Sequence, residues 1–205
     1  PGTSVDNYVL FQPASGTLED VVFSSQTAAS YVLNLANANH IRLNKLKITF
    51  NPNVVVTYPL RLGMNSTGCQ ILNCRFEEVY AYSTALFYSG GADSLLVKNC
   101  DFARGRIAIS MVGPASDNMA HGNRVEGCHV TSPQNTGIIL RNQVNGVIDS
   151  CWVTGVTSNA SYCILLQDCS GATRVTRNVV YTTKGAPAIG ATDFNGTPDN
   201  YAVIA

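Results

Sequence analysis

The chain has 205 residues, of which 45% are hydrophobic and only 13% are charged. Its 13 basic and 13 acidic residues cancel, so bulk charge gives no reason to expect nucleic acid, an anionic membrane surface or a polyanion as partner. No apolar run approaches the roughly 18 residues of a membrane-spanning helix. The length suits one domain, and low charge with many Ser, Thr, Asn and Gly residues is typical of extracellular β proteins.

A repeat runs through the whole chain. Four cysteines stand at nearly even intervals in similar local sequences. The repeat extends upstream and downstream when positions are matched by chemical type instead of by identical residues. The equivalent positions are Val21, Leu46, Cys74, Cys100, Cys128, Cys151 and Asn178. A repeat with a period of roughly 20 to 50 residues indicates stacked structural units, so we expect a solenoid of about seven coils.

Two apolar columns confirm the register of the repeat. Three residues before the marked positions stand Leu18, Leu43, Ile71, Val97, Val125, Ile148 and Val175. Two residues after them stand Phe23, Ile48, Phe76, Phe102, Val130, Val153 and Val180. The marked residue and the residue two later share a face of one strand, whereas the residue three earlier breaks this alternation, so a corner separates two short strands. Asn73, Asn99, Gly127 and Ser150 occupy that corner, and Asn and Gly tolerate the left-handed backbone of a tight bend.

A third strand precedes each corner. Its segments are 31–35, 58–62, 85–88, 107–111, 137–141 and 163–167. These runs are too short and too rich in β-branched residues for amphipathic helices. Three short strands per coil predict an all-β parallel solenoid of triangular section.

This plan resembles the right-handed parallel β-helix of the pectin-lyase-like superfamily, from about Tyr8 to Val203. Corner asparagines stack as a ladder in that family, which implies a ladder that includes Asn73 and Asn99. The segment 30–49 is most similar to β-helix repeats of large secreted bacterial surface proteins. The resemblance implies a single-stranded right-handed parallel β-helix of about seven coils of three short strands, with residues 1–205 as one domain.

Neither end of the repeat carries a polar capping element, and the last coil stops in mid-strand at Ala205. Solenoids need caps to protect their end edges. We therefore expect residues 1–205 to be a fragment of a longer chain, or the ends to be covered by a partner. Self-association through uncapped ends, or as a trimer, is the corresponding prediction.

The seven cysteines are interpreted as structural. The four in the repeat point inward, where they fill one interior row as small hydrophobic side chains, and their parallel directions disfavour disulfides. Cys163 and Cys169 straddle a turn and are the best candidates for a disulfide. Zinc is not expected, because no Cys-x-x-Cys occurs and the three histidines lie apart from the thiols.

Enzymes of the superfamily that this chain resembles work on the sheet formed by the first strand of each coil, in a groove walled by long loops. The outward residues expected on that sheet are Asn34, Arg61, Tyr88, Ser110, Arg141 and Gln167. Glycoside hydrolysis needs two carboxyl groups, and lyases of this type need aspartates clustered around calcium together with an arginine base. Arg61 and Arg141 could supply the arginine, but the row contains no carboxylate and the connections after the third strand are short. The sequence therefore leans against a built-in catalytic cleft.

One cluster of charged residues just past the third strand is the remaining candidate for a catalytic site. The candidate catalytic residues are Glu77, Glu78, Asp101 and Arg104, with Arg106 close by. They form either a carboxylate pair oriented by arginines or an exposed salt-bridge cluster that contributes little to stability. The second interpretation is favoured.

A row of outward residues directly follows the marked positions. It comprises Lys47, Arg75, Asp101, His129 and Trp152. An exposed Trp beside a His can stack on the apolar face of a pyranose ring, although cross-strand charge pairing explains the row almost as well. The candidate substrate-binding residues are Trp152, His129, Arg75, Tyr88, Arg61 and Arg141.

Two further clusters have a simple structural alternative. Tyr80, Tyr82 and Tyr88 form either a binding platform or a packed loop, and the packed loop is favoured. Calcium is considered only at Asp193, Asn195, Asp199 and Asn200. These lack the spacing and the Glu of a dedicated calcium loop, which favours a solvated turn, so we expect no cofactor and no bound metal.

Three functions remain open from the sequence. The first is an extracellular, cell-surface module that binds polysaccharide or acts as an adhesin-like spacer without its own catalytic cleft. The second is a polysaccharide lyase or glycoside hydrolase. The third is a segment of a phage tailspike or fibre, which predicts a trimer.

Overall fold

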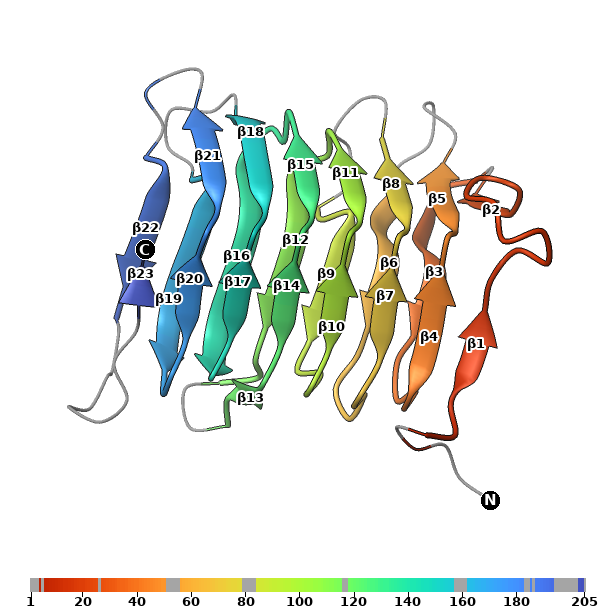
Figure 1. The fold of residues 1–205 in the computed structure, drawn as a ribbon, viewed down its shortest axis with the longest axis horizontal. Helices are drawn as coiled ribbons and strands as arrows, with labels where there is room; N and C mark the ends of the chain where they lie inside the picture. Colours follow the sequence, from red (N-terminus) through yellow and green to blue (C-terminus); the bar gives the residue numbers. More distant parts are fainter. Residues whose placement is uncertain are drawn as a thin grey trace.

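The computed structural model describes residues 4, 6–25, 27–50, 56–78, 84–115, 118–156, 162–182, 185, 187–193 and 203–204. The regular elements within these ranges are all β-strands, and successive coils stack them in parallel into three sheets. The two ends of the chain lie at opposite ends of the stack (Figure 1). The described residues contain no helix long and apolar enough to cross a membrane.

Sheet A has eight strands. In spatial order they are β1 (Val9–Phe11), β4 (Ile41–Asn44), β7 (Gln70–Leu72), β10 (Leu96–Lys98), β14 (Arg124–Glu126), β17 (Val147–Asp149), β20 (Arg174–Thr176) and β23 (Val203–Ile204).

Sheet B has seven strands, and from β5 onward each follows a strand of sheet A after one corner. They are β2 (Val22–Ser25), β5 (Lys47–Phe50), β8 (Arg75–Glu77), β11 (Asp101–Ala103), β15 (His129–Thr131), β18 (Trp152–Val156) and β21 (Val179–Thr182).

Sheet C closes each coil. Its strands are β3 (Ala29–Leu35), β6 (Val56–Leu62), β9 (Phe87–Gly90), β12 (Ile107–Val112), β16 (Thr136–Val144), β19 (Ile164–Ser170) and β22 (Ile189–Thr192). The short strand β13 (Ala120–His121) pairs with the far end of β16. The all-β, right-handed parallel solenoid with three strands per coil is therefore confirmed.

The corner between sheets A and B has the left-handed backbone that the sequence predicts. The residues with positive φ in this column are Lys45, Asn73, Asn99, Gly127, Ser150 and Arg177. Asn73 donates a hydrogen bond from Nδ2 to Asn44 Oδ1 over 2.8 Å, which links adjacent coils. A Cβ at Gly127 would lie 2.6 Å from Asn99 Oδ1, so a larger residue at this corner would have to displace the Asn99 amide.

The interior is built from repeating columns. Both predicted apolar columns are buried through the central coils, and Phe76 and Phe102 stack with ring centroids 4.6 Å apart. All seven cysteines are buried and free, which confirms the interior row at the four repeat positions. The proposed disulfide between Cys163 and Cys169 is wrong, because each thiol instead points to a backbone carbonyl, that of Tyr181 and those of Leu140 and Gln167 respectively.

One predicted row on sheet C is out of register. Ser110 pairs with Ile139, and Arg141 pairs with Val112, so Arg141 does not continue the row of Arg61, Tyr88 and Ser110. The register is set by core packing, which aligns the buried residues of β12 with those of β16. The aligned pairs are Ile109 with Ile138 and Met111 with Leu140.

Candidate functional site

The outer face of sheet B carries a row of side chains that runs along the solenoid axis. We call it the axial row, and its members in register are Val22, Lys47, Arg75, Asp101, His129, Trp152 and Val179. Neighbouring strands of a sheet lie about 4.8 Å apart, so the row presents side chains at a regular spacing. The predicted row from Lys47 to Trp152 is therefore confirmed as an alignment.

A second row lies beside the first on the same face. We call it the threonine row, and its members in register are Ser24, Thr49, Glu77, Ala103, Thr131, Thr154 and Tyr181. Hydroxyl groups donate and accept hydrogen bonds without carrying charge. The two rows together form a polar track with aromatic residues at one end.

The end of this track nearer the N-terminus is a network of paired charges. Lys47 Nζ lies 3.7 Å from Glu19 Oε2 and 3.4 Å from Glu77 Oε2. Arg75 lies 2.7 Å from Glu19 through Nη1 and 3.8 Å from Glu77 through Nε. Both cations are therefore neutralised by carboxylates. The ion pairs of Glu77 are formed with Lys47 and Arg75, which the predicted cluster of Glu77, Glu78, Asp101, Arg104 and Arg106 did not include.

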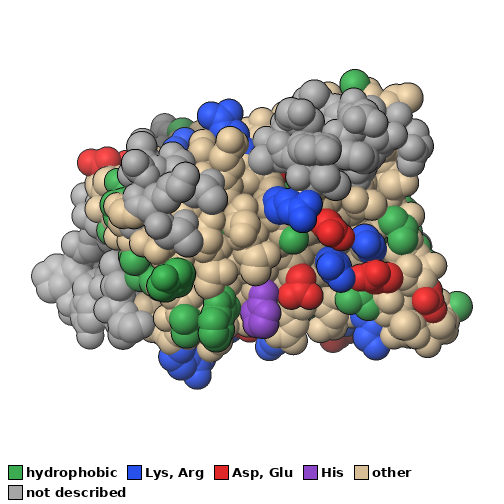
Figure 2. Space-filling view, turned by 90° about the horizontal axis from the view of Figure 1, so that it is seen from above, with side chains coloured by type: hydrophobic (Ala, Val, Ile, Leu, Met, Phe, Trp, Pro, Cys, Tyr) green, Lys and Arg blue, Asp and Glu red, His purple; other side chains and the backbone are tan. Residues whose placement is uncertain are grey.

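The opposite end of the track is aromatic. Trp152 is 51% exposed and Tyr181 is 65% exposed, although both are large side chains with much apolar surface. The Trp152 and His129 rings lie 6.5 Å apart and are tilted by 54°. Figure 2 shows hydrophobic side chains on one side of a histidine and interspersed acidic and basic side chains on the other.

A shallow hollow of about 270 Å³ lies between the two ends. Arg75, Asp101, His129 and Thr131 contribute to its lining. His129 Nδ1 is 3.8 Å from Asp101 Oδ1, and both side chains are mostly exposed. The hollow therefore brings three of the predicted residues together with a hydroxyl group from the threonine row.

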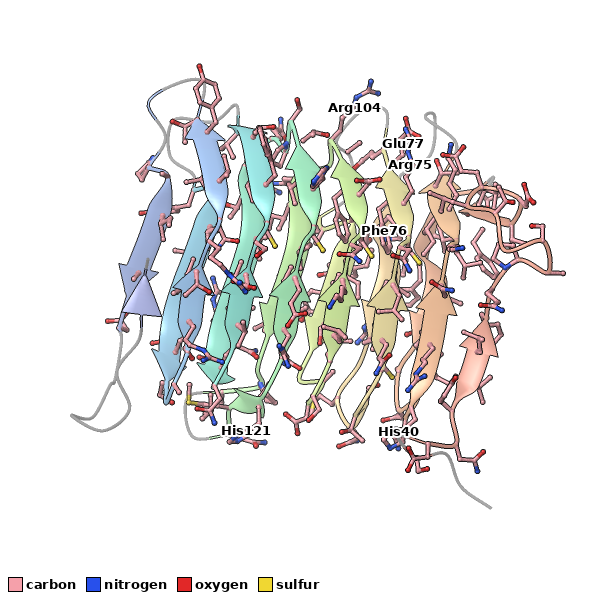
Figure 3. The ribbon with its side chains drawn as sticks, in the orientation of Figure 1. His40, Arg75, Phe76, Glu77, Arg104 and His121 are labelled. Atoms are coloured by element: carbon pink, nitrogen blue, oxygen red, sulfur yellow. The ribbon has the colours of Figure 1, made fainter. Side chains whose placement is uncertain are left out.

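The predicted carboxylate pair at Glu77 and Glu78 does not form. Arg75 and Glu77 project from the same face of β8, with the buried Phe76 between them (Figure 3). Glu78 is only 1% exposed, and its backbone N–H donates to Ala103 O at 3.2 Å, so it does not share the outer face with Glu77. Consecutive residues of an extended chain point in opposite directions, which explains the separation.

Arg104 also lies away from the hollow. It occupies the corner after β11 with a φ of 67°, and its exposed side chain projects beyond the end of the strand (Figure 3). Arg106 is likewise exposed. Of the predicted catalytic residues, only Glu77 and Asp101 face the same surface, on adjacent strands.

Sheet C carries a separate cluster of tyrosines around one arginine. Arg61 Nη1 donates a hydrogen bond to Tyr31 OH, and its guanidinium lies 5.1 Å from the centroid of that ring. Tyr58 and Tyr88 stack with centroids 4.5 Å apart. Burial, followed by the proximity of Tyr88, raises the pKa of Tyr58, so this hydroxyl stays protonated at neutral pH.

Arg61 and Tyr88 line a small hollow of about 230 Å³ on this sheet, together with Met64 and Pro114. Arg141 lies two coils beyond Tyr88, in register with Gln167. The six predicted binding residues therefore divide between two surfaces. Trp152, His129 and Arg75 lie on sheet B, and the others lie on sheet C.

Several predicted features fall outside the described residues. These are Tyr80 and Tyr82, and, from the calcium candidates, Asn195, Asp199 and Asn200. Within the described ranges, no group of three or more His, Cys, Asp or Glu side chains is placed to hold a metal ion.

Sequence reasoning missed four residues that contribute to these surfaces. Glu19 reaches Arg75 across the intervening coil, and no local pattern signals a contact over that separation. Tyr181 could have been found by extending the frame two residues beyond Val179. Tyr31 and Tyr58 stand at equivalent positions of two coils, a match that was visible in the repeat.

Comparisons with known proteins agree with this architecture. Among solved structures, the chain is similar to the catalytic domain of a GH87 alpha-1,3-glucanase variant in complex with tetrasaccharides, with 11% identity and a TM-score of 0.37. The match covers 95% of this chain and 62% of that one, so the chain spans less than two thirds of that domain. No curated protein matches the chain. Residues 31–200 match the family described as "Right handed beta helix region", and the chain belongs to this family.

Proposed function

We propose that this β-helix is an extracellular module that binds a polysaccharide along the outer face of sheet B. It acts as an adhesin-like or spacer-like surface and has no catalytic cleft of its own. The observation that carries the proposal is the in-register track of the axial and threonine rows, which ends at the exposed Trp152 and Tyr181. An aromatic ring offers an apolar face to a sugar ring, while hydroxyl and imidazole groups beside it can bind the sugar hydroxyls.

The direction of the track favours an extended chain rather than a compact ligand. Parallel strands repeat the same side-chain position at every coil, so successive sugar units can meet equivalent positions along the axis. The hollow of about 270 Å³ is open and shallow, which suits one face of a chain. The residues with direct roles in this proposal are Trp152, His129, Thr131 and Tyr181.

The charges favour a neutral polysaccharide over an acidic one. The two cations of the axial row, Lys47 and Arg75, already lie within 4 Å of Glu19 and Glu77. Recruiting either cation to a uronate would break an existing pair. Binding should therefore depend little on salt, because exposed charges contribute little to it.

The glycoside hydrolase alternative rests on Glu77 and Asp101, which share the outer face on adjacent strands. Glu77 is held by Lys47 and Arg75, and Asp101 lies beside His129. Glu77 and Asp101 are therefore the two candidate carboxyl groups for a hydrolase, but neither lies in an enclosed site that would exclude water. The non-catalytic proposal is therefore preferred.

The test is a glycan array in which product release is followed on the same panel of neutral and acidic polysaccharides. We expect binding of a neutral polysaccharide without cleavage, and weaker binding by the Trp152→Ala variant. Leu10→Ala is the matched control, since Leu10 is an exposed apolar residue on sheet A. New reducing ends or unsaturated uronates would overturn the proposal, and Glu77→Gln and Asp101→Asn would then be the first variants to examine. A trimer in light scattering, without glycan binding, would favour the tailspike alternative.

A further inference from the structure

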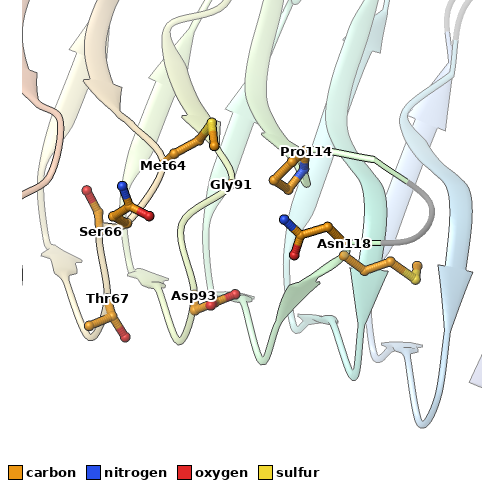
Figure 4. Close-up of a pocket in the computed structure, with 9 residues that line it drawn as sticks. Met64, Ser66, Thr67, Gly91, Asp93, Pro114 and Asn118 are labelled. Atoms are coloured by element: carbon orange, nitrogen blue, oxygen red, sulfur yellow. The ribbon is translucent and has the colours of Figure 1, made fainter.

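A second and larger hollow lies where the strands of sheet C turn toward sheet A. We call it the corner pocket, and its volume is about 410 Å³. Three successive coils line it, with Met64 and Asn65 from the first, Asp93 from the second, and Pro114 and Asn118 from the third. Pro114 and Asn118 belong to the connection after β12, and β13 at the end of this connection pairs with β16. Figure 4 shows the residues that line the pocket.

Gly91 forms the narrow edge of the corner pocket. A Cβ at this position would lie 3.0 Å from Pro114 Cγ and 3.2 Å from Met64 Cγ, and φ is +84°. Met64 and Pro114 therefore converge over a residue that has no side chain, and they supply an apolar wall (Figure 4). Glycine suits this position because it permits both the close approach and the positive φ.

Asp93 places a carboxylate in the corner pocket and is held there by backbone groups. Its Oδ1 accepts a hydrogen bond of 2.6 Å from the backbone N–H of His121. Its own backbone N–H donates to Ser66 O at 3.0 Å, and Thr67 bridges to it from the preceding coil. A carboxylate has about four acceptor sites, so one bond to His121 leaves acceptor capacity for hydroxyl groups of a ligand.

Two amide side chains, Asn65 and Asn118, line the corner pocket together with Asp93. Asn65 donates from Nδ2 to Asn37 Oδ1 at 3.3 Å, which orients its amide at the coil edge. Asn118 is exposed and stands on a turn closed by two backbone hydrogen bonds with Ala115, of 3.2 and 3.5 Å. Each amide group offers both donors and an acceptor.

This combination of a carboxylate, two amides and an apolar wall selects a class of ligand. The carboxylate repels anions, and no group of three His, Cys, Asp or Glu side chains suited to a metal occurs in the part of the chain that the structure describes. Vicinal hydroxyl groups match the alternation of acceptors and donors, and the C–H face of a sugar matches Met64 and Pro114. The volume lies within the roughly 300–1,000 Å³ of small-molecule sites and is sufficient for one or two sugar units.

We propose that the corner pocket is a second carbohydrate site, which binds a neutral sugar unit through vicinal hydroxyl groups. It does not rest on the sheet B proposal, since the two surfaces share no residue. The hollow lined by Arg61 and Tyr88 adjoins the corner pocket, because Met64 and Pro114 line both. A disaccharide therefore extends from Asp93 past Met64 toward Tyr88.

The test uses the full chain with methyl glucoside, methyl galactoside and methyl mannoside, followed by saturation-transfer NMR and calorimetry. Asp93→Asn keeps an acceptor for the His121 N–H but loses the charge, and Asn118→Ala changes only an exposed turn. We expect Asp93→Asn to weaken binding of the preferred sugar about tenfold, since a hydrogen bond to a charged group has roughly that effect. Asn118→Ala should weaken it less, about fivefold, because a hydrogen bond to a neutral amide contributes less. Circular dichroism and thermal melting confirm that both variants fold.

Leu10→Ala changes an exposed residue of sheet A outside both surfaces, so it is the matched control and should leave monosaccharide binding unchanged. Trp152→Ala separates this proposal from the first. Loss of binding in Trp152→Ala alone would place the sugar on sheet B and overturn the corner pocket, while the sheet B proposal would stand. No binding to the wild type, unchanged binding in both pocket variants, or equal binding of methyl glucuronide would also overturn it. For a disaccharide, Tyr88→Ala should weaken binding while monosaccharide affinity stays constant, and no change would refute the direction proposed for the second unit.

Discussion

The inner and the outer side of the coil differ in how their residues vary from one coil to the next, at the corner before each strand of sheet B and at the strand's first residue. On the inside, the marked position repeats one residue through Cys74, Cys100, Cys128 and Cys151, all of them buried. One residue later, on the outside, the sequence changes from coil to coil as Arg75, Asp101, His129 and Trp152. The inner side chain must fill the same space in every coil, whereas the outer one meets solvent or a ligand. A residue that repeats from coil to coil therefore indicates core packing. A position whose residue varies between coils indicates where binding specificity can lie.

The largest expected effect comes from comparing alanine substitutions at two adjacent residues, one buried and one on the outer face. Phe102→Ala removes a ring that stacks on Phe76 and should lower the free energy of unfolding by about 3–5 kcal/mol. Asp101→Ala, one residue earlier on the outer face, should change it by less than about 0.5 kcal/mol. Denaturant unfolding of both variants measures the difference. Similar losses would mean that the outer row also stabilises the stack.

The second prediction concerns the outer face, where a substitution should weaken ligand binding and leave stability unchanged. Trp152→Ala should weaken binding of the neutral polysaccharide by about 2 kcal/mol, or roughly thirtyfold, because an aromatic anchor commonly contributes that much. Its melting temperature should stay close to that of the wild type, since Trp152 is half exposed. Titration calorimetry and thermal melting provide the two measurements. A fall in both would show that Trp152 supports the fold rather than the ligand.

The third prediction concerns the cysteine row. Burial raises the pKa of the Cys100 thiol, and burial raises that of Cys169 to about 11, so both stay protonated and shielded at neutral pH. Iodoacetamide should label none of the seven cysteines in the folded protein and all seven after unfolding, as counted by mass spectrometry. Cys100→Ala should cost about 1 kcal/mol, close to the loss of one buried methylene. Rapid labelling of any repeat cysteine in the native state would contradict the interior row.

The smallest expected effect on stability comes from the exposed ion pair between Asp149 and Arg177. Hydrogen bonds from Arg177, followed by that from Thr176, lower the pKa of Asp149 from 3.8 to about 2. The folded state thus binds the proton less tightly than the unfolded state, so the pair stabilises the protein above about pH 4 and loses this effect as the pH falls toward 2.

Arg177 is 75% exposed, so solvent screens the pair and we expect its contribution to stability to be small. Asp149→Asn should remove this contribution at neutral pH and flatten the change in melting temperature between about pH 4 and pH 2. Arg177→Ala is the matched control, because it removes the partner and leaves the carboxylate. If both variants keep the wild-type acid dependence, another carboxylate governs it.

Most of the fold was predictable because each coil repeats the same local requirements. The column from Leu43 to Val175 and the corner at Asn73 and Asn99 are visible in the sequence, since each coil must bury an apolar residue and turn at the same point. The alignment of Arg75 with Asp101 followed from the same frame. The register of Arg141 did not, because Ile139 and Arg141 share the outer face of β16 and only the pairing of β16 with β12 decides which of them follows Ser110.

The sequence by itself determined the solenoid, its parallel strands and the row that ends at Trp152, because a repeat that buries the same positions in every coil admits one register on sheets A and B. The tertiary structure alone decided that Glu78 is buried, that Glu19 reaches Arg75, and that Asp93 and Asn118 line the same pocket. These contacts join residues whose separation or loop conformation no periodic pattern encodes. Packing between coils and the path of the insertion after β12 bring them together.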